Sequence, residues 1–252
     1  MSCRNNTSNR IRKRVSSFIS LILNLKRFLA GEVAISWSQT GEDVLLQAFL
    51  RNRIDDASYN GFWVDIGAHH PVKWSNTKTF SDRGWRGINV DASVNAIEIL
   101  NKKRARDINV NVGIGPVSGV LDYYKMSMPA MNTFSKEFAE KAEIRGGRIV
   151  DVVKVPVITL RELLDRYLPS GQHIDFLSID CEGLDLSILQ SSDWYRYRPD
   201  YILVEIHTEG RNWDIPNCSV SRYMREQGYE FVGQSYVTTL YKCVSTMPVS
   251  DR

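Results

Sequence analysis

Cysteine patterns and long apolar runs are missing from this sequence. Its four cysteines are scattered with no C-x-x-C pair, so neither a disulfide framework nor a zinc site is predicted, and a reducing compartment fits best. The apolar stretch over residues 15–29 is far too short to span a bilayer. These absences exclude disulfide-stabilised secreted domains, zinc-binding modules and membrane-spanning proteins.

Acidic side chains are absent from residues 1–30, which hold seven basic ones. The rest of the chain has 25 basic against 29 acidic residues, so the formal net charge of +3 divides into a basic N-terminus and an acidic body. A nucleic-acid-binding protein would instead carry basic residues over its folded face. We therefore expect no nucleic-acid partner.

The basic N-terminus has the pattern of an amphipathic helix. Within residues 10–30, apolar side chains recur at helical spacing with Lys and Arg at both ends. The pattern fits either a membrane-surface helix attracted to anionic lipid or a helix packed on the domain or on a partner subunit. Lys26 and Arg27 follow the apolar run and argue against an export signal. We expect a cytoplasmic protein, peripheral to the inner face of the membrane in the first case.

The remaining composition is typical of one α/β domain of enzyme size. The chain has 252 residues, of which 43% are hydrophobic, enough to bury a full core. We expect a basic segment over residues 1–35, a folded domain over 36–246 and a tail over 247–252. The sequence does not predict an oligomeric state.

The folded domain is organised around a buried strand and a glycine turn. Residues 62–66 are apolar except for Asp65, and Gly67 ends this strand before a helix predicted over 76–83. This order forms the first unit of an open α/β sheet, whose ligands bind beyond the carboxyl ends of the strands. The G-x-G-x-x-G motif of NAD and FAD sites is missing, because Ala, His, His and Pro follow Gly67. A nucleoside ligand without phosphates, such as S-adenosylmethionine, needs only the close approach at the turn.

A second strand, predicted over residues 87–91, ends in Asp91. Asp91 lies 26 residues beyond Asp65, close to the interval at which an acid on the second strand binds ribose hydroxyls. A carboxylate accepts two hydrogen bonds from a vicinal diol. The alternative role for Asp91 is to cap the helix predicted over residues 94–103. Together with the first motif, the spacing favours ribose binding.

Strands predicted over residues 174–180 and 201–207 add further acids and a histidine. Because parallel strands end at the same edge of a sheet, we expect these side chains to converge with those of the first two strands. Convergent acids and a histidine at this edge are typical of an active site. The expected cluster consists of Asp65, Asp91, Asp180, Glu182, Glu205 and His207.

The other segments predict the rest of an α/β sheet. We expect a third strand over 107–112, a hairpin over 117–124, an irregular lid or substrate loop over 125–148, and a strand over 152–158. Thr159 is expected to cap a helix that runs to Leu168. A last helix over 219–228 and a closing hairpin over 229–244 would place an antiparallel strand in the sheet.

Five motifs together resemble the FkbM family of class I S-adenosylmethionine-dependent methyltransferases, over about residues 36–244. The motifs are Ser38–Asp43, Val64–Ala68, Asn89–Asp91, Ile179–Gly183 and Val204–His207. The resemblance implies a Rossmann-like seven-stranded sheet with helices on both faces and an antiparallel closing strand. It also implies O-methylation of a hydroxyl of a sugar in a glycan, glycolipid or related natural product.

The resemblance implies a role for each candidate site residue. The cofactor would lie over Gly67 and Ala68, with its ribose on Asp91 and its amino group near Asp65, Gln39 or Glu42. His207 is the first choice of base and Asp180 the second. The expected acceptor-binding residues are Glu182, Glu205, Asn132 and Thr133. We expect the three acids Asp180, Glu182 and Glu205 to accept hydrogen bonds from hydroxyls rather than to hold a divalent cation, which is the alternative.

One position departs from the family pattern, and two other functions compete with methyl transfer. His70 stands where the family usually has glycine, two residues after Ala68, so the methionine end of the cofactor is expected to be held differently. A nucleotide-sugar oxidoreductase would need the missing glycines. A catalytically inactive Rossmann-like domain that acts as a membrane-associated adaptor would bind no cofactor.

Overall fold

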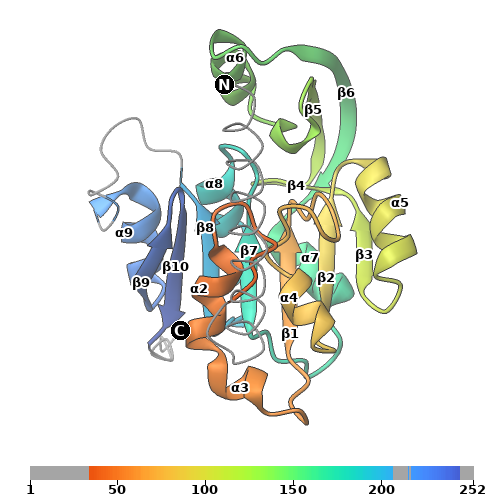
Figure 1. Ribbon diagram of the computed structural model, residues 1–252. Helices are drawn as coiled ribbons and strands as arrows, with labels where there is room; N and C mark the ends of the chain where they lie inside the picture. The colour runs from red at the N-terminus through yellow and green to blue at the C-terminus, as the bar shows by residue number, and fades with distance from the viewer. Residues whose placement is uncertain (1–33, 207–214, 216, 245–252) are drawn as a thin grey trace, which may run out of the picture. The chain divides into compact units, whose positions relative to one another are not determined.

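The centre of the molecule is a seven-stranded sheet with the order β3-β2-β1-β7-β8-β10-β9 (Figure 1). A computed structural model describes residues 34–206, 215 and 217–244. The first five strands of this order are parallel, whereas β10 is antiparallel to both β8 and β9. The strands are β1 (Phe62–Ile66), β2 (Arg86–Asp91), β3 (Ile108–Asn111), β7 (Phe176–Ile179), β8 (Tyr201–Glu205), β9 (Tyr229–Ser235) and β10 (Thr238–Cys243). The predicted seven-stranded α/β sheet with an antiparallel closing strand is confirmed.

Helices cover both faces of this sheet because alternate residues of its strands are apolar on opposite sides. The helices are α2 (Glu42–Phe49), α3 (Arg51–Asp55), α4 (Lys78–Asp82), α5 (Val94–Lys103), α7 (Leu160–Tyr167), α8 (Asp185–Gln190) and α9 (Ser219–Glu226). On β1, Trp63 belongs to a core with α2 and α4, and Val64 belongs to a second core with α7, α8 and α9. Thr159 caps α7 as predicted, since its side chain accepts a hydrogen bond from the N–H of Glu162.

A second sheet of three strands lies beyond the carboxyl ends of the main strands (Figure 1). Its order is β4 (Gly113–Ile114), β6 (Ile149–Ile158) and β5 (Gly119–Met126). The hairpin predicted over residues 117–124 is wrong, because β5 pairs along its length with the distant β6. The irregular loop predicted over 125–148 is also wrong in part, since it contains η1 (Pro129–Met131) and α6 (Lys136–Ile144). Ser135 starts α6 by accepting a hydrogen bond from the N–H of Phe138.

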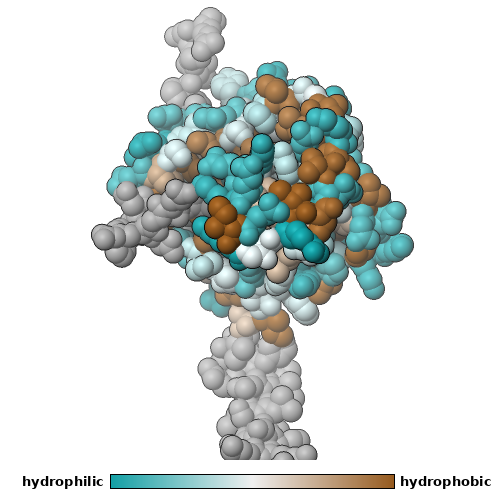
Figure 2. All heavy atoms as spheres, turned by 90° about the horizontal axis from the view of Figure 1, so that it is seen from above, coloured by the Kyte–Doolittle hydropathy of each residue, from teal (hydrophilic) through white to brown (hydrophobic). Residues whose placement is uncertain are grey.

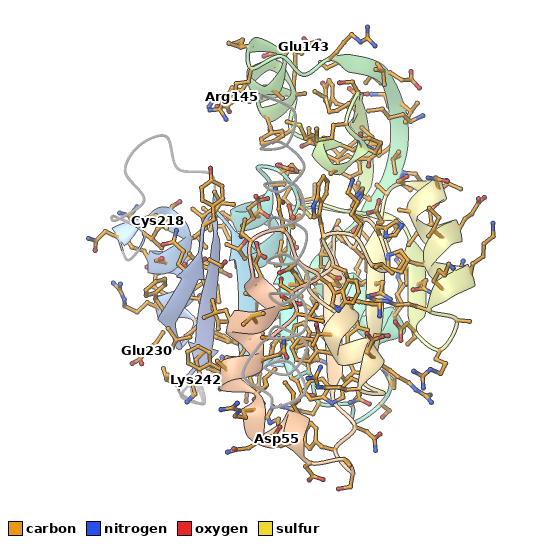
Figure 3. All side chains as sticks on the ribbon, viewed as in Figure 1. Asp55, Glu143, Arg145, Cys218, Glu230 and Lys242 are labelled. Atoms are coloured by element: carbon orange, nitrogen blue, oxygen red, sulfur yellow. The ribbon has the colours of Figure 1, made fainter. Side chains whose placement is uncertain are left out.

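The layer that carries α6 has an outer surface of mixed polarity. Glu143 and Arg145 mark the end of α6, at the opposite end of the molecule from Asp55 (Figure 3). Seen from above, separate apolar patches lie among hydrophilic side chains (Figure 2). Ile144 is 86% exposed and Met128 is 51% exposed. No helix in the described part of the chain is long and apolar enough to cross a membrane. The amphipathic segment over residues 10–30 lies outside the described residues.

Gly67 holds the turn after β1 against the end of β7. Its φ is +85°, and a Cβ at this position would lie 2.0 Å from the carbonyl oxygen of Asp180. The N–H of Gly67 donates to the carbonyl of Val90 over 2.9 Å, and the N–H of Asp180 donates to that of Ile66 over 3.0 Å. Only glycine combines this backbone conformation with this approach. The turn therefore joins the carboxyl ends of β1, β2 and β7.

We expect Gly67→Ala to lower the free energy of unfolding more than Gly84→Ala does. Gly84 has a similar φ of +89°, but nothing lies within 4 Å of the Cβ that alanine would add. Gly84→Ala therefore loses only the free energy needed to hold alanine in a left-handed backbone conformation, about 1–2 kcal/mol. Gly67→Ala adds an overlap with the Asp180 main chain. Urea unfolding of both variants measures the difference, and equal losses would contradict the tight approach at Gly67.

Candidate active site

A cavity of about 940 Å³ lies at the carboxyl edge of the main sheet, between this edge and the layer of η1 and α6. Gly67 follows β1 on its wall, and Asp91 ends β2. Asp180 follows β7 and Glu205 ends β8 on the same wall. The parallel strands thus bring these four residues, which are distant in sequence, to a single site.

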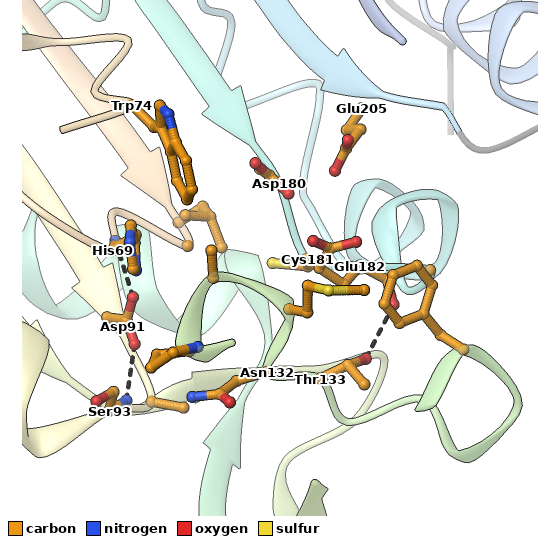
Figure 4. A pocket seen from close by; sticks show the side chains of 18 of the residues that line it. His69, Trp74, Asp91, Ser93, Asn132, Thr133, Asp180, Cys181, Glu182 and Glu205 are labelled. Carbon is orange, nitrogen blue, oxygen red and sulfur yellow. Dashed lines mark hydrogen bonds between the residues drawn. The ribbon is translucent and has the colours of Figure 1, made fainter. Parts of the chain in front are cut away.

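Asp91 is held by two backbone donors and stands against an apolar wall. Its Oδ2 accepts a hydrogen bond of 2.9 Å from the N–H of His69, and its Oδ1 accepts one of 2.7 Å from the N–H of Ser93 (Figure 4). Each carboxylate oxygen has a second lone pair, so Asp91 retains two acceptor positions for a ligand. The N-cap of α5 is Ser93, not Asp91. The apolar residues lining the same cavity include Ala96, Ile99, Val112 and Ile114.

Three acids cluster at the ends of β7 and β8. One carboxylate oxygen from each of Asp180, Glu182 and Glu205 lies within 4.8 Å of the other two (Figure 4). The Asp180 side chain is exposed to the cavity, whose walls surround it. Desolvation by these walls, the neighbouring carboxyl of Glu205 and then that of Glu182 raise the pKa of Asp180 well above its usual value. The cluster can accept hydrogen bonds from hydroxyl groups and can take up a proton at a higher pH than an ordinary carboxylate.

The turn that carries these acids is fixed from two sides. Asp185 accepts hydrogen bonds of 3.0 Å and 3.1 Å from the N–H groups of Cys181 and Gly183, and its burial raises its pKa to about 7. From the other layer, the hydroxyl of Thr133 donates to the carbonyl of Glu182 over 2.9 Å (Figure 4). Asn132 accepts a hydrogen bond of 2.8 Å from the N–H of Met126. Both residues line the cavity; Thr133 joins its two layers, whereas Asn132 joins the end of η1 to β5 within one layer.

The N-terminal motif of the domain closes another side of the cavity. Asp43 is completely buried, and its carboxylate accepts hydrogen bonds of 2.8 Å from the hydroxyl of Ser38 and 2.9 Å from that of Thr79. This anchors the motif on α4. Glu42 is 4% exposed and accepts a hydrogen bond of 2.8 Å from the N–H of Thr40. Gln39 and Glu42 both line the cavity, as the predicted cofactor role requires.

Two predicted cofactor contacts, Asp65 and Ala68, are buried and are not among the described residues that line the cavity. The Asp65 carboxylate accepts a hydrogen bond of 3.4 Å from the hydroxyl of Thr77. Burial raises its pKa to about 6, although the charge of Arg104 opposes this rise. Arg104 donates to the same Thr77 hydroxyl over 2.5 Å. Asp65 and Arg104 thus stabilise the loop after β1. The predicted base His207 lies outside the described residues.

Several residues of the cavity wall were not among the predicted site residues: His69, Trp74, Tyr123 and Tyr236. The described non-glycine residues with a left-handed backbone all line the cavity, and strained backbone of this kind concentrates at functional sites. They are His69, Trp74, Glu182 and Tyr236, with φ values of +46°, +57°, +48° and +51°. Tyr123 also lines the cavity while being only 6% exposed. Periodicity and composition carry no signal for such positions, since a left-handed backbone is uncommon outside glycine and bulky residues such as Trp and Tyr adopt it least.

The raised pKa of Asp91 predicts a pH-dependent stability. Burial raises this pKa from 3.8 to about 6, so the folded state binds more protons than the unfolded state between these values. The contribution of Asp91 to stability therefore falls as the pH rises through this window. Asp91→Asn removes the titration. We expect the free energy of unfolding of the variant, relative to the wild type, to be higher at about pH 8 than at about pH 4.5 in urea unfolding. A difference that is the same at both pH values would contradict the shifted pKa.

Comparison with solved structures gives distant similarities to three methyltransferases. One is the 1,6-didemethyltoxoflavin N1-methyltransferase of Burkholderia thailandensis, with bound 1,6-didemethyltoxoflavin and S-adenosylhomocysteine. It is 12% identical to this chain and has a TM-score of 0.43, and the similarity covers 97% of this chain and 92% of that one. An O-methyltransferase from Bacillus cereus in complex with S-adenosylhomocysteine is 12% identical, with a TM-score of 0.38 and 91% coverage of both chains. A methyltransferase from Agrobacterium tumefaciens is 9% identical, with a TM-score of 0.36 and coverage of 81% and 62%. These similarities are too weak to say more about this chain.

A family match is more informative than these structures. Comparison with curated proteins finds no match. The family described as the methyltransferase FkbM domain, in contrast, matches residues 65–231, which is well over half of the chain and runs from β1 into β9. This range contains Asp91 and the acidic cluster of the cavity. The resemblance found in the sequence is thereby confirmed, and the chain belongs to the FkbM methyltransferase family.

Proposed function

We propose that this chain is an S-adenosylmethionine-dependent O-methyltransferase that acts on a hydroxyl of a sugar in a glycan, glycolipid or related natural product. One observation carries the proposal: in a chain of the FkbM family, a single cavity joins Asp91 to a cluster of three acids. Asp91 offers the acceptor pair that a ribose diol needs. The acids offer several acceptors for the hydroxyls of a sugar.

The residues around Asp91 fit the nucleoside part of this cofactor. Its two carboxylate oxygens are oriented by backbone N–H groups and retain acceptor capacity for the ribose. The apolar stretch of wall beside it suits an adenine ring, and its residues are Ala96, Ile99, Val112 and Ile114. When bound, S-adenosylmethionine supplies a methyl group that is already activated by the positive charge on its sulfur.

The protein then has to align an acceptor oxygen with this methyl group and remove the hydroxyl proton. Alignment of two reactants contributes about 7–11 kcal/mol, and a positioned base about 10²–10⁴ in rate. Asp180 lies on the cavity wall and its raised pKa makes it a stronger base than an ordinary carboxylate. We propose Asp180 as the base within the described residues, with His207 as the other candidate. Glu182 and Glu205 would hold the neighbouring hydroxyls, and Asn132 and Thr133 would border the acceptor.

In the alternative arrangement, the same site would hold a divalent cation. Asp180, Glu182 and Glu205 are oxygen donors at mutual distances that suit one ion, which would in turn bind a sugar diol. We propose the metal-free arrangement, in which the three acids bind the hydroxyls directly. The two arrangements differ in their response to a chelator.

Ligand-induced thermal stabilisation tests the proposed function. We expect S-adenosylmethionine and S-adenosylhomocysteine to raise the melting temperature, because a ligand that binds only the folded state at 100 times its Kd stabilises it by about 2.7 kcal/mol. We expect NAD to have no effect and EDTA to leave both shifts unchanged. A shift with NAD would favour an oxidoreductase, and no shift with either adenosyl ligand would favour an inactive adaptor. Loss of the shifts in EDTA would favour the metal.

Methyl transfer to a panel of glycans and glycolipids extends the same experiment to the base. With any acceptor found, Asp180→Asn should lower kcat by about 10²–10⁴ and leave the affinity for S-adenosylhomocysteine within about twofold. Asp122→Asn is the matched control, because Asp122 forms an ion pair with Lys154 on the second sheet, away from the cavity wall. Retained turnover in Asp180→Asn, together with its loss in His207→Gln, would assign the base to His207.

A further inference from the structure

The loop after β1 fixes the imidazole of His70 in one tautomer. Its Nδ1 lies 3.1 Å from the backbone nitrogen of Val72 and 2.9 Å from that of Lys73, and both N–H groups donate to it. A backbone N–H can only donate, so Nδ1 is the acceptor and carries no proton. The ring proton of the neutral imidazole is therefore on Nε2. His70 is one of the residues that line the cavity, and it is only partly buried.

The surroundings of this donor are positive. Burial, and then the nearby charges of Lys73 and Arg104, lower the pKa of His70. Arg104 is itself buried, with 6% of its surface exposed, and binds the same loop through the carbonyl of Pro71. Protonation of Nδ1 would also break both backbone hydrogen bonds of the loop. His70 is thus a neutral N–H donor beside two cations, an environment that favours an anionic oxygen over an ammonium group.

The donor is also close in the chain to the proposed ribose site. The preceding residue, His69, donates its backbone N–H to Asp91. A ligand whose ribose lies on Asp91, and whose adenine lies on the apolar wall, has its opposite end near the loop that starts at Gly67. In the proposed cofactor this end carries one anionic group, the carboxylate of its amino-acid part.

We propose that the Nε2–H of His70 donates a hydrogen bond to the carboxylate of the bound S-adenosylmethionine. This inference rests on the proposed function. His70 then has two tasks: its Nδ1 orders the loop, and its Nε2–H binds the cofactor.

A pair of ligands that differ only in the carboxylate tests this contact. The affinities of S-adenosylmethionine and of decarboxylated S-adenosylmethionine are measured by calorimetry on the wild type and on His70→Asn. The oxygen of asparagine can still accept the loop N–H groups from two and three residues ahead, as in an Asx turn, but its short side chain places no donor where Nε2 lies. We expect His70→Asn to weaken binding of S-adenosylmethionine by roughly tenfold to a hundredfold, the value of a hydrogen bond to a charged group, and to leave binding of the decarboxylated ligand unchanged.

A second variant keeps the inference testable if the asparagine disturbs the loop. His70→Gln places an amide N–H close to the position of Nε2, and we expect it to bind S-adenosylmethionine more tightly than His70→Ala does. An equal loss for both ligands in all three variants would overturn the inference and leave His70 a role in the loop only. No loss for either ligand would also overturn it. Failure of the wild type to bind either ligand would instead overturn the proposed function itself.

Discussion

The contact between the turn after β1 and the end of β7 is the constraint on which the site depends. At Gly67 the chain passes so close to the carbonyl of Asp180 that no side chain fits between them. The same turn donates to the end of β2 through the N–H groups of Gly67 and Ala68, which both bond to Val90. One glycine therefore fixes the relative positions of the strand ends that carry Asp91 and Asp180.

Around this contact, backbone N–H groups rather than cations hold Asp91 on the cavity wall and the buried Asp185 behind it. Asp91 accepts from His69 and Ser93, and Asp185 accepts from Cys181 and Gly183. Burial with partners of this kind orients a carboxylate and still leaves its pKa raised, as for both of these residues. The cavity is lined by Asp91, Asp180, Glu182 and Glu205, which suits a positively charged ligand such as the sulfonium of the proposed cofactor. The cation Arg104 does not bind these acids but donates a hydrogen bond to the carbonyl of Pro71, in the loop that carries His70.

The sequence allowed the main sheet to be predicted because each strand has its own local signal. Apolar runs such as residues 62–66 and 201–205 predict buried strands, and the rule for parallel strands brings their ends together. The second sheet was not predictable in this way. β5 pairs with β6, and α6 lies between these two strands in the chain. Local turn signals do not predict pairing between strands that are this far apart in sequence. The position of Asp65 could not be predicted for a similar reason. Alternation along a strand shows that successive side chains lie on opposite faces, but not which face borders the cavity and which lies near Arg104.

The least predictable part of the site is its strained backbone. Trp74 and Tyr236 have a left-handed backbone, which bulky side chains disfavour, and tertiary contacts must hold them there. The tautomer of His70 likewise depends on two hydrogen bonds within its loop. A sequence motif identifies where such a loop begins, but not the donors and acceptors that it presents to the cavity.

A crystal structure of this protein with S-adenosylhomocysteine tests the proposed cofactor site most directly. We expect the ribose hydroxyls to lie within hydrogen-bond distance of the two Asp91 oxygens, about 2.5–3.0 Å. We also expect the sulfur to face the cluster of Asp180, Glu182 and Glu205. A ligand bound outside this cavity, or inside it with its ribose away from Asp91, would contradict the proposed cofactor site.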